Sequence, residues 1–290
     1  MKLLVIVVVY NGIKWLDKCL SSVRNSNTPA DLFVVDNGST DNSIQYIQQN
    51  YSESNFIISK SNLGFGQANN LGLKYAIENK YDFVYLLNQD AWVKPDTFEK
   101  LIVASYQNPQ FGILSPLQVN GNETLLDYNF YHYCCPRTLS SASLLRHSFK
   151  TIYETDFVMA AHWLISTKCL ATVGIFSPTF FHYGEDNNYI DRLKFHNFKV
   201  GIVPTCIGVH DREERPTSNE KKIYMYYIDK LIQLSNPCNK QSSTKIYRAL
   251  FMMGVRCREF SYIKKLFLLI RSRKDIIRNK QISQKEGAFL

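Results

Sequence analysis

Carboxylates and a histidine follow apolar runs of this sequence at the points where the chain turns polar. Glu185 and Asp186 come directly after a glycine, where a helical pattern of apolar residues begins. His210 follows Asp186 by 24 residues and closes an apolar run, and Asp90 closes another one upstream. A carboxylate in such a place can act as a general base or bind a hard cation, and a histidine can bind a metal. We therefore expect a metal and general-base site.

Each of these residues also has a structural explanation. Acids in the first turn of a helix, such as Glu185 and Asp186, interact favourably with the helix dipole. A single histidine such as His210 is more often a hydrogen-bonded structural residue, and Asp90 taken alone fits a solvated loop. The residue types by themselves leave both explanations open.

Short apolar runs alternate with helical patterns over the first 90 residues. This β-α-β alternation predicts an α/β fold with a mainly parallel sheet, right-handed crossovers and flanking helices. Ligands bind such sheets at the carboxyl ends of the strands, where Tyr10-Asn11, Asp36 and Asp90 fall. The runs expected to be strands are Leu3–Val9, Asp31–Val35, Asn55–Ser59 and Phe83–Leu87.

Two further segments fit either a ligand site or an ordinary turn. Asp36 lies in a turn of small polar residues, where its carboxylate can accept a hydrogen bond from a base or sugar, or can simply form the turn. Gly64 and Gly66 precede a helix, so backbone amides there can approach a phosphate. The dinucleotide-binding fingerprint is not matched, because the third glycine is missing and the segment follows the third strand rather than the first.

Length and composition limit the class of protein. The chain has 290 residues, 45% of them hydrophobic, which suffices for one large domain or for one domain with an extension. No window reaches the roughly 18 apolar residues that span a bilayer, and the apolar start is typical of a buried strand rather than of a signal sequence. The seven cysteines include no C-x-x-C pair, so we expect reduced thiols. These features predict a cytoplasmic protein or one bound to a membrane surface.

Positive charge is concentrated at the C-terminal end. Residues 240–290 carry 13 Lys or Arg and 3 Asp or Glu, a net charge of +10, which leaves −1 for the rest of the chain. Apolar and basic residues are interleaved between 248 and 273, as in amphipathic helices that lie on anionic lipid. A helix packed on the body with a solvated basic face explains the pattern equally well. Nucleic acid is not expected as a partner, because the body has no matching basic surface.

The sequence pattern also suggests a division of the chain. Periodicity is lost between residues 120 and 150, which predicts a long functional or mobile loop. It returns from about 155 to 210, and basic amphipathic helices follow. We therefore expect a catalytic domain in residues 1–215 and a helical basic extension in residues 216–290.

The order of these motifs resembles that of the family 2 glycosyltransferases with the GT-A fold, in particular the bacterial rhamnosyltransferase-like members. The resemblance extends from about Leu3 to Asp211. The segments that carry it are Val8–Asn11, Val34–Asp41, Asn62–Asn70, Leu86–Asp90, Gly174–Ser177, Phe181–Asp186 and Val209–His210.

The resemblance implies roles for individual residues. Asp186 corresponds to the catalytic base, with Glu185 beside it. Asp90 corresponds to a ligand of Mg²⁺ or Mn²⁺, and His210 to a residue that can complete the metal site. The residues expected to bind the nucleotide sugar are Tyr10, Asn11, Asp36, Asn62, Gly64, Asn69 and Asn88.

The sequence departs from the family pattern at two positions. Asn88 stands where the D-x-D element has its first acid, which weakens ribose or metal contact there. Asn188 stands where the E-D-x-D element has its last acid. The acid expected to be the base is retained at Asp186, so the resemblance still implies an active enzyme.

The implied activity is inverting transfer of a sugar from a UDP- or dTDP-linked donor to a hydroxyl of a saccharide or lipid-linked acceptor, in cell-surface polysaccharide synthesis. The implied location is the cytoplasm, with the basic tail on the inner face of the plasma membrane. A nucleotidyltransferase is one alternative, although it would be expected to have a glycine-rich phosphate loop after the first strand. An inactive sugar-nucleotide-binding protein is the other, suggested by Asn88 and Asn188.

Overall fold

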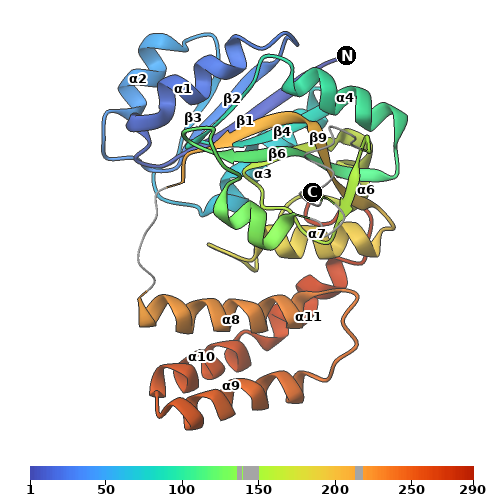
Figure 1. The fold of residues 1–290 in the computed structure, drawn as a ribbon. Coiled ribbons are helices and arrows are strands. Elements are labelled where there is room, and N and C mark those ends of the chain that lie inside the picture. The colour runs from blue at the N-terminus through green and yellow to red at the C-terminus, as the bar shows by residue number, and fades with distance from the viewer. Residues whose placement is uncertain (136–138, 140–149, 213–217) are drawn as a thin grey trace.

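The computed structural model describes residues 1–135, 139, 150–212 and 218–290 and shows a central sheet with helices on both faces (Figure 1). The strand order is β3-β2-β1-β4-β8-β6-β9-β5, and β7 pairs with β9 outside this path. The strands are β1 (Leu3–Val9), β2 (Asp31–Asp36), β3 (Asn55–Ile58), β4 (Phe83–Asn88), β5 (Ala91–Val93), β6 (Phe111–Asn120), β7 (Tyr153–Thr155), β8 (His162–Ser166) and β9 (Lys199–His210). The helices that flank them are α1 (Ile13–Arg24), α2 (Ser43–Asn50), α3 (Phe65–Glu78), α4 (Thr97–Gln107), α6 (Thr167–Val173) and α7 (Glu185–Phe195).

The first four strands form the parallel half of the sheet that the alternation predicts. The residues of β1, β2 and β4 are apolar almost throughout because both faces of these strands are covered, whereas β3 at the edge of the sheet is partly exposed. In β1, Leu3, Val5 and Val7 pack with side chains of α1, α2 and α4. Leu4 and Ile6, which point to the other face, pack with side chains of α3, α6 and α7. The two hydrophobic layers on either side of the sheet hold the strand ends in a fixed order.

The second half of the sheet is mixed. β8 lies antiparallel between β4 and β6, and β5 lies antiparallel to β9. Only Gln89 and Asp90 separate β4 from β5, which is too short a connection for a parallel crossover, so β5 pairs with a distant strand instead. The prediction of a mainly parallel sheet therefore describes the first four strands and the pairing of β6 with β9, whereas β5, β7 and β8 are antiparallel to their neighbours.

The segment expected to be a long loop has local structure where it is described. A π-helical turn, η1 (Phe130–Cys134), follows Asp127, whose Oδ1 accepts a hydrogen bond of 2.8 Å from the backbone amide of Phe130. Residues 136–138 and 140–149 of the expected loop lie outside the described residues, and so does the domain boundary expected at residue 215. All seven cysteines are described and are free thiols.

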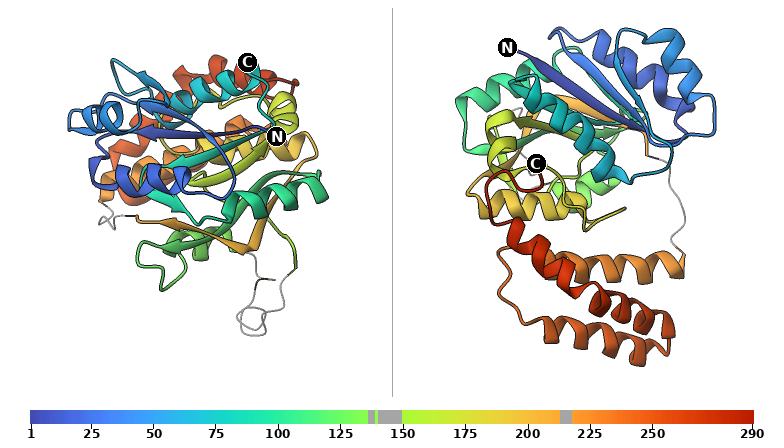
Figure 2. Two further views of the ribbon diagram at one scale, coloured as in Figure 1. Left: turned by 90° about the horizontal axis from the view of Figure 1, so that it is seen from above. Right: turned by 180° about the vertical axis from the view of Figure 1, so that it is seen from behind.

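The basic extension forms four helices below the sheet: α8 (Asn219–Ser235), α9 (Ser243–Cys257), α10 (Phe260–Arg271) and α11 (Arg273–Ile282). Phe180 of the body packs in one hydrophobic cluster with Ile228 and Leu231 of α8 and with buried residues of the later helices. Figure 2 shows α9 and α10 as the helices farthest from the sheet. Across the described ranges, no helix is long and apolar enough to cross a membrane.

After α11 the chain returns to the body. The backbone amide of Ile175 donates a hydrogen bond of 3.0 Å to the carbonyl of Ala288, and that of Gly287 donates one of 3.0 Å to the carbonyl of Thr172. The Phe289 ring lies 5.2 Å from the guanidinium of Arg192, which is fully buried. The extension is therefore attached to the body at both ends, through α8 and through the residues after α11, whereas the segment 248–273 for which the two explanations were given lies mainly in α9 and α10.

The contact with Ala288 depends on a glycine. Gly174 has φ 82° and ψ −157°, a conformation that is essentially restricted to glycine, and a Cβ there would lie 1.9 Å from the Ala288 carbonyl oxygen. We predict that Gly174→Ala lowers the free energy of unfolding by at least about 2 kcal/mol, from backbone strain and the displaced chain end. Urea unfolding followed by circular dichroism measures this loss.

Gly287→Ala is the matched control for this change. Gly287 also has a positive φ, 62°, but a Cβ there would meet only the flexible Leu290 side chain at 3.2 Å and the Ala171 carbonyl at 3.6 Å. Gly287→Ala should lower the free energy of unfolding clearly less than Gly174→Ala does. Equal losses for the two variants would show that docking of Ala288 contributes nothing to stability.

Candidate active site

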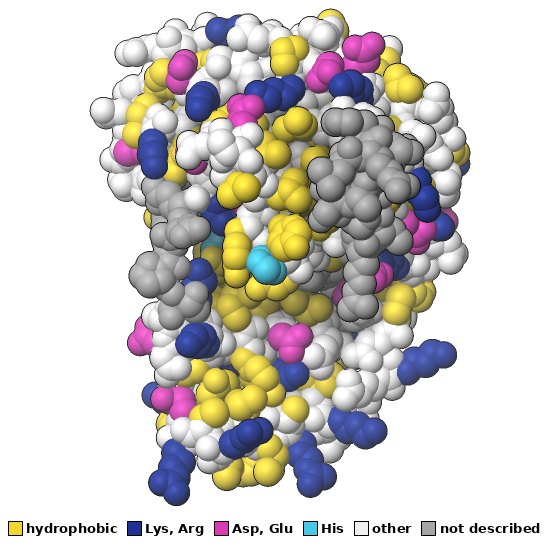
Figure 3. All heavy atoms as spheres, in the orientation of Figure 1, with side chains coloured by type: hydrophobic (Ala, Val, Ile, Leu, Met, Phe, Trp, Pro, Cys, Tyr) yellow, Lys and Arg dark blue, Asp and Glu magenta, His cyan; other side chains and the backbone are white. Residues whose placement is uncertain are grey.

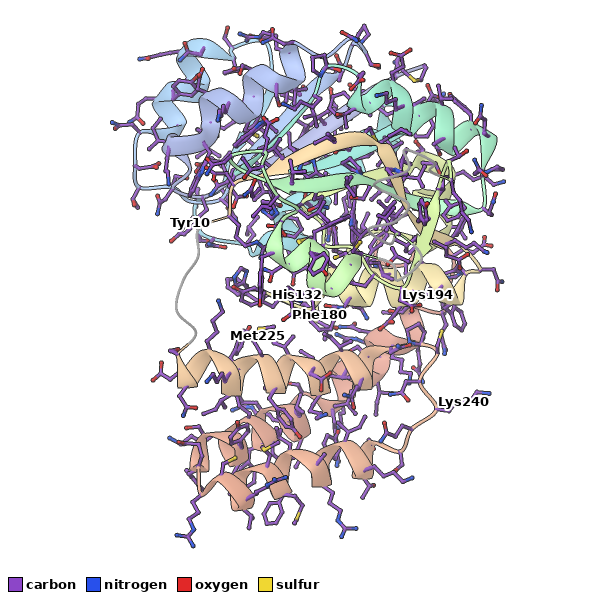
Figure 4. The ribbon with its side chains drawn as sticks, viewed as in Figure 1. Tyr10, His132, Phe180, Lys194, Met225 and Lys240 are labelled. Atoms are coloured by element: carbon purple, nitrogen blue, oxygen red, sulfur yellow. The ribbon has the colours of Figure 1, made fainter. Side chains whose placement is uncertain are left out.

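The polar residues that end the parallel strands meet at one edge of the sheet. Val9 lies opposite Asp36 in the β1–β2 pairing, and Val8 lies opposite Asn88 in the β1–β4 pairing. Tyr10, the residue after β1, is 47% exposed and lies at this edge (Figure 4). The structure thus brings together Tyr10, Asp36 and Asn88, as the fold class requires.

Hydrogen bonds from two neighbouring loops fix the backbone that follows β1. The Gln89 side chain accepts a hydrogen bond of 2.8 Å from the Tyr10 amide and donates one of 3.1 Å to the Tyr10 carbonyl. The Asn11 amide donates to the Ser39 hydroxyl at 3.0 Å, and its side-chain oxygen accepts from the Thr40 amide at 2.8 Å. Asn11 therefore joins the loops after β1 and β2, and Tyr10 is held with its ring exposed.

The Asp36 carboxylate forms the turn with one oxygen and leaves its other oxygen without a partner among the described residues. Its Oδ1 accepts hydrogen bonds from the amides of Gly38 and Ser39, at 3.1 and 3.0 Å, and so forms the turn. Its Oδ2 is buried and has no hydrogen-bond partner within the described ranges. A buried acceptor without a partner is unfavourable unless a ligand supplies the donor, so this oxygen is a candidate contact for one.

Asn62, Gly64 and Asn69 each have a structural role. The Asn62 side-chain oxygen accepts hydrogen bonds from the Gly64 amide and the Asn37 side chain, at 2.8 and 3.1 Å. Gly64 packs so tightly that a Cβ there would lie 2.0 Å from the carbonyl oxygen of Phe181. Asn69 is buried within α3, and its side chain donates to the Phe65 carbonyl at 2.9 Å. Their contact with a nucleotide sugar stays a prediction.

The pairing of β5 with β9 brings Asp90 to His210. Ala91 lies opposite His210 in that pairing, and Oδ1 of Asp90 lies 3.4 Å from Nε2 of the ring. Burial raises the pKa of the Asp90 carboxyl, but His210, a backbone hydrogen bond and Arg212 together outweigh burial, and the pKa ends below its ordinary value. Nδ1 of His210 is buried without a hydrogen-bond partner in the described part of the chain, as is the side-chain oxygen of Asn88.

A second histidine, His162, is fully buried and holds the backbone beside His210. His162 of β8 contacts the Tyr85 hydroxyl through Nδ1 at 2.8 Å and the Val209 carbonyl through Nε2 at 3.0 Å. Burial lowers the pKa of His162 to about 3, with a smaller contribution from His210, so the ring is neutral. A neutral ring donates from Nε2 to Val209 and accepts from Tyr85, which fixes the backbone next to His210.

The two adjacent acids open α7, directly after Gly184. Glu185 is 7% exposed, and its Oε2 has no hydrogen-bond partner within the described residues. Burial, with the charge of Asp186 as a smaller cause, raises the pKa of Glu185 to about 7. Burial also raises the pKa of Asp186 to about 6, although the amide of Asn187 donates a hydrogen bond of 2.8 Å to its Oδ1. Two acids that titrate near neutral pH can exchange protons with a ligand under physiological conditions.

Arg212 connects the two groups of acids and was not predicted from the sequence. Its positive charge lowers the pKa of both Asp90 and Asp186 as a minor contribution, so it lies within electrostatic reach of each. Its Nε lies 3.7 Å from Oδ2 of Asp127, which is 3% exposed. The only available signal was the position of Arg212 two residues after His210. Nothing in the sequence marked Asp127 as its partner.

A pocket of about 610 Å³ opens beside this cluster. His210, Asp211 and Arg212 line one side of it, and residues 120–131 line the rest, including Tyr128 and Tyr131. Both tyrosines are more than half exposed, at 66% and 59%. The pocket thus combines aromatic faces with the charged groups at the end of β9. Its wall comes from the stretch in which the sequence showed no periodicity.

Comparison with known proteins identifies the family. The model of glycosyl transferase family 2 matches residues 4–170, which is more than half of the chain. The protein therefore belongs to glycosyl transferase family 2, and the resemblance inferred from its motifs is confirmed. Membership of this family favours sugar transfer over the nucleotidyltransferase alternative.

Two relatives are similar over most of this chain. The low-salt glycan biosynthesis hexosyltransferase Agl10 of Haloferax volcanii is 23% identical over 208 residues, covering 69% of this chain and 64% of the relative. This chain thus spans less than two thirds of that protein. The N-acetylglucosaminyl-diphospho-decaprenol L-rhamnosyltransferase of Mycobacterium tuberculosis is 24% identical over 267 residues, covering 78% of this chain and 84% of the relative.

Solved structures confirm the fold class. S. aureus TarS 1-349 in complex with UDP-GlcNAc superimposes with a TM-score of 0.59 at 15% identity, covering 98% of this chain and 79% of that one. GalNAc-T7 with UDP, GalNAc and Mn²⁺ gives a TM-score of 0.60 at 15% identity, covering 83% and 51%. The GT-A fold expected from the sequence is therefore confirmed.

The raised pKa of Glu185 gives a prediction about stability. Because the folded state holds this proton more tightly than the unfolded chain, the stabilising contribution is complete below the ordinary pKa of 4.5 and is lost as the pH rises through about 7. Glu185→Gln should therefore raise the free energy of unfolding by roughly 2 kcal/mol at about pH 8 and change it little at about pH 5.

Urea unfolding of both proteins at the two pH values measures this difference. Glu220→Gln is the control, because Glu220 also lies in the first turn of a helix, α8, but is exposed. Equal effects of the two substitutions, or a gain for Glu185→Gln that does not depend on pH, would contradict the burial argument.

Proposed function

We propose that the protein transfers a sugar from a nucleoside-diphosphate donor to an acceptor hydroxyl with inversion at the anomeric carbon. The observation that carries this proposal is the pairing of β5 with β9, which places Oδ1 of Asp90 3.4 Å from Nε2 of His210, together with Asp186 in the first turn of α7. Asp90 is suited to binding a cation beside the donor diphosphate, and Asp186 is suited to accepting the proton of the acceptor hydroxyl.

The donor is assigned to the edge where β1, β2 and β4 end. The unpartnered Oδ2 of Asp36 can accept a hydrogen bond from a base or ribose, and the exposed Tyr10 ring can stack on the base. Asn88 offers an amide oxygen that has no hydrogen-bond partner among the described residues. A UDP- or dTDP-linked sugar fits these contacts. The TarS structure with UDP-GlcNAc and the GalNAc-T7 structure with UDP, which share only the fold, are compatible with that choice.

Asp90 and His210 are the residues proposed to hold Mg²⁺ or Mn²⁺. The described residues contain no cluster of three or more His, Cys, Asp or Glu side chains, so a complete protein cage is absent there. One carboxylate and one imidazole nevertheless suit a cation that takes its remaining ligands from the donor phosphates and water, and Nδ1 of His210 is unpartnered. When bound, the cation would neutralise charge on the departing diphosphate.

Asp186 is proposed as the general base. Its pKa of about 6 leaves it ionised at neutral pH yet basic enough to accept a proton. The acceptor oxygen forms a bond to the anomeric carbon as its proton passes to Asp186. The bond between that carbon and the diphosphate oxygen breaks, and the nucleoside diphosphate leaves with the electron pair. Glu185, with a pKa of about 7, is partly protonated under the same conditions, which limits the buried negative charge.

The acceptor is assigned to the pocket beside His210. The exposed rings of Tyr128 and Tyr131 offer apolar faces for sugar rings, and Asn120 and Asn122 offer amides for hydroxyl groups. A saccharide or lipid-linked saccharide of a cell-surface polysaccharide fits this chemistry, and the mycobacterial relative is named for such a lipid-linked acceptor. A lipid-linked acceptor would place the protein in the cytoplasm, at the inner face of the plasma membrane.

The first prediction tests the base. Asp186→Asn should leave donor binding nearly unchanged and lower turnover by a factor on the order of 10²–10⁴, which is the usual contribution of general-base catalysis. In the unsubstituted protein, turnover should rise with pH around an apparent pKa of about 6. Release of nucleoside diphosphate with a saccharide acceptor measures turnover, and calorimetry measures donor binding.

Asp191→Asn provides the matched control, because Asp191 lies on the same helix and also has a pKa raised to about 6, mainly by burial. Similar turnover for the two variants would contradict the assignment. Donor binding without turnover in the unsubstituted protein, over a broad acceptor panel, would favour the inactive binding protein instead.

The second prediction tests the cation site. Asp90→Ala should abolish the Mn²⁺-dependent part of nucleoside-diphosphate binding, because a hard oxygen ligand is lost. His210→Ala should weaken that binding less, since water can replace an imidazole. Titration calorimetry with and without Mn²⁺ separates the two effects. Activity that survives EDTA unchanged would show that neither residue serves a metal.

A further inference from the structure

The two helices farthest from the sheet expose apolar side chains in a continuous arrangement. On α9 the exposed Val255 follows Met252 by three residues and Phe251 by four, and on α10 the exposed Phe267 follows Phe260 by seven residues and precedes Ile270 by three, which is the spacing of one helix face. Exposure reaches 52% at Val255 and 63% at Phe267. We call this surface the outer face. It consists of Phe251, Met252, Val255, Phe260, Phe267, Leu268 and Ile270.

The fold does not use the outer face. The opposite sides of the two helices supply the buried contacts: Leu250 of α9 and Leu266 and Leu269 of α10 belong to the cluster that includes α8. Each helix therefore has large apolar side chains on two sides, one buried against its neighbours and one exposed to solvent. Exposed apolar patches of this kind usually mark an interaction surface.

Basic residues accompany the apolar ones. The stretch from Ser243 to Arg271 contains seven Lys or Arg and one acid, Glu259, whose carboxylate caps α10 through the Ser261 amide. None of the seven forms an ion pair within the described part of the chain. Figure 3 shows the hydrophobic side chains gathered over the lower helices with Lys and Arg around them. Six of the basic residues are exposed, namely Lys245, Arg248, Arg256, Arg258, Lys264 and Arg271, whereas Lys265 lies over the Tyr224 and Tyr227 rings of α8.

The charge of the outer face decides between possible partners. A second copy of the chain would bring a like-charged stretch against it, which opposes self-association. A bilayer with anionic headgroups offers the complementary charge and also an apolar layer for Phe251, Phe260 and Phe267.

We propose that the outer face of α9 and α10 docks on an anionic bilayer, with the Phe and Leu side chains inserted among the lipids and the basic residues at the headgroups. This names the surface that would bring the proposed transfer to a lipid-linked acceptor. The inference rests on the proposed function only for the choice of acceptor, and docking itself is measured without catalysis.

The test measures flotation of the full chain with vesicles of phosphatidylcholine, with and without phosphatidylglycerol. The protein should float with the anionic vesicles at low salt and progressively less as salt rises. Arg248→Gln/Arg256→Gln/Lys264→Gln should weaken binding on the order of 100-fold, from the usual contribution of each basic residue at an anionic surface. Phe251→Ser/Phe267→Ser should weaken binding to the anionic vesicles by a similar factor at low and at higher salt.

Matched controls replace the same residue types on the body. Lys60→Gln/Lys74→Gln/Lys168→Gln removes three exposed charges, and Ile58→Ser/Val103→Ser removes two exposed apolar side chains. Both should bind as the unsubstituted protein does. Thermal unfolding of every variant verifies that the fold is intact, and transfer to a soluble saccharide should be unchanged by the substitutions on the outer face.

Three outcomes would overturn the proposal. The first is flotation that is equal for neutral and anionic vesicles. The second is an equal loss of binding in the control variants. The third is a dimer in sedimentation that Phe251→Ser/Phe267→Ser dissociates while vesicles are not bound, which would assign the outer face to self-association. Loss of transfer to a soluble acceptor with docking intact would instead count against the proposed function alone.

Discussion

The antiparallel pairing of β5 with β9 is the constraint on which the candidate site depends. Asp90 and His210 are 120 positions apart in the sequence, and this pairing alone places them side by side. It also continues the chain from His210 to Arg212, whose charge reaches the acids on either side. The short turn between β4 and β5 enforces the pairing, because it leaves β5 no room to cross over. The pairing therefore sets the positions of the candidate cation ligands Asp90 and His210, whereas the Asp186 carboxylate is positioned separately by α7.

The candidate site contains buried polar groups that lower the free energy of unfolding, and the rest of the fold must offset this loss. Buried acceptors of Asp36, Asn88 and Glu185 have no hydrogen-bond partners among the described residues, and Glu185 and Asp186 hold their protons more tightly than exposed acids do. Two apolar layers and a sheet buried on both faces provide the offsetting stability. A ligand that donates hydrogen bonds and carries a cation would relieve part of this cost. Unfavourable groups of this type are expected where a protein is organised for binding rather than for stability alone.

Much of the fold could be predicted because its signals are local. The runs at Leu3–Val9 and Phe83–Leu87 match observed strands to within one residue, since a strand covered on both faces must be apolar throughout. Asp36, Asp90 and Asp186 could be singled out because each lies where an apolar or helical pattern changes. Arg212 and Asp127 could not, because their relation arises only when the ends of β6 and β9 come together. β5 has only three residues, which is too short a strand to show an alternating or apolar pattern. The π-helical turn at Phe130–Cys134 has no periodicity by which it could be predicted from the sequence.

The attachment of the helical extension at both of its ends has a geometric consequence. A surface carried on a single flexible tether could meet a membrane at any angle, but α8 packs against Phe180 and the residues after α11 are hydrogen-bonded to Thr172 and Ile175. The outer face of α9 and α10 is therefore held at a set height and tilt relative to the strand ends. If the outer face docks on a bilayer as proposed, an acceptor hydroxyl would reach the proposed base, Asp186, only if the lipid anchor of the acceptor spans that height. The selection of acceptors would then depend on reach above the lipid surface as well as on the identity of the sugar.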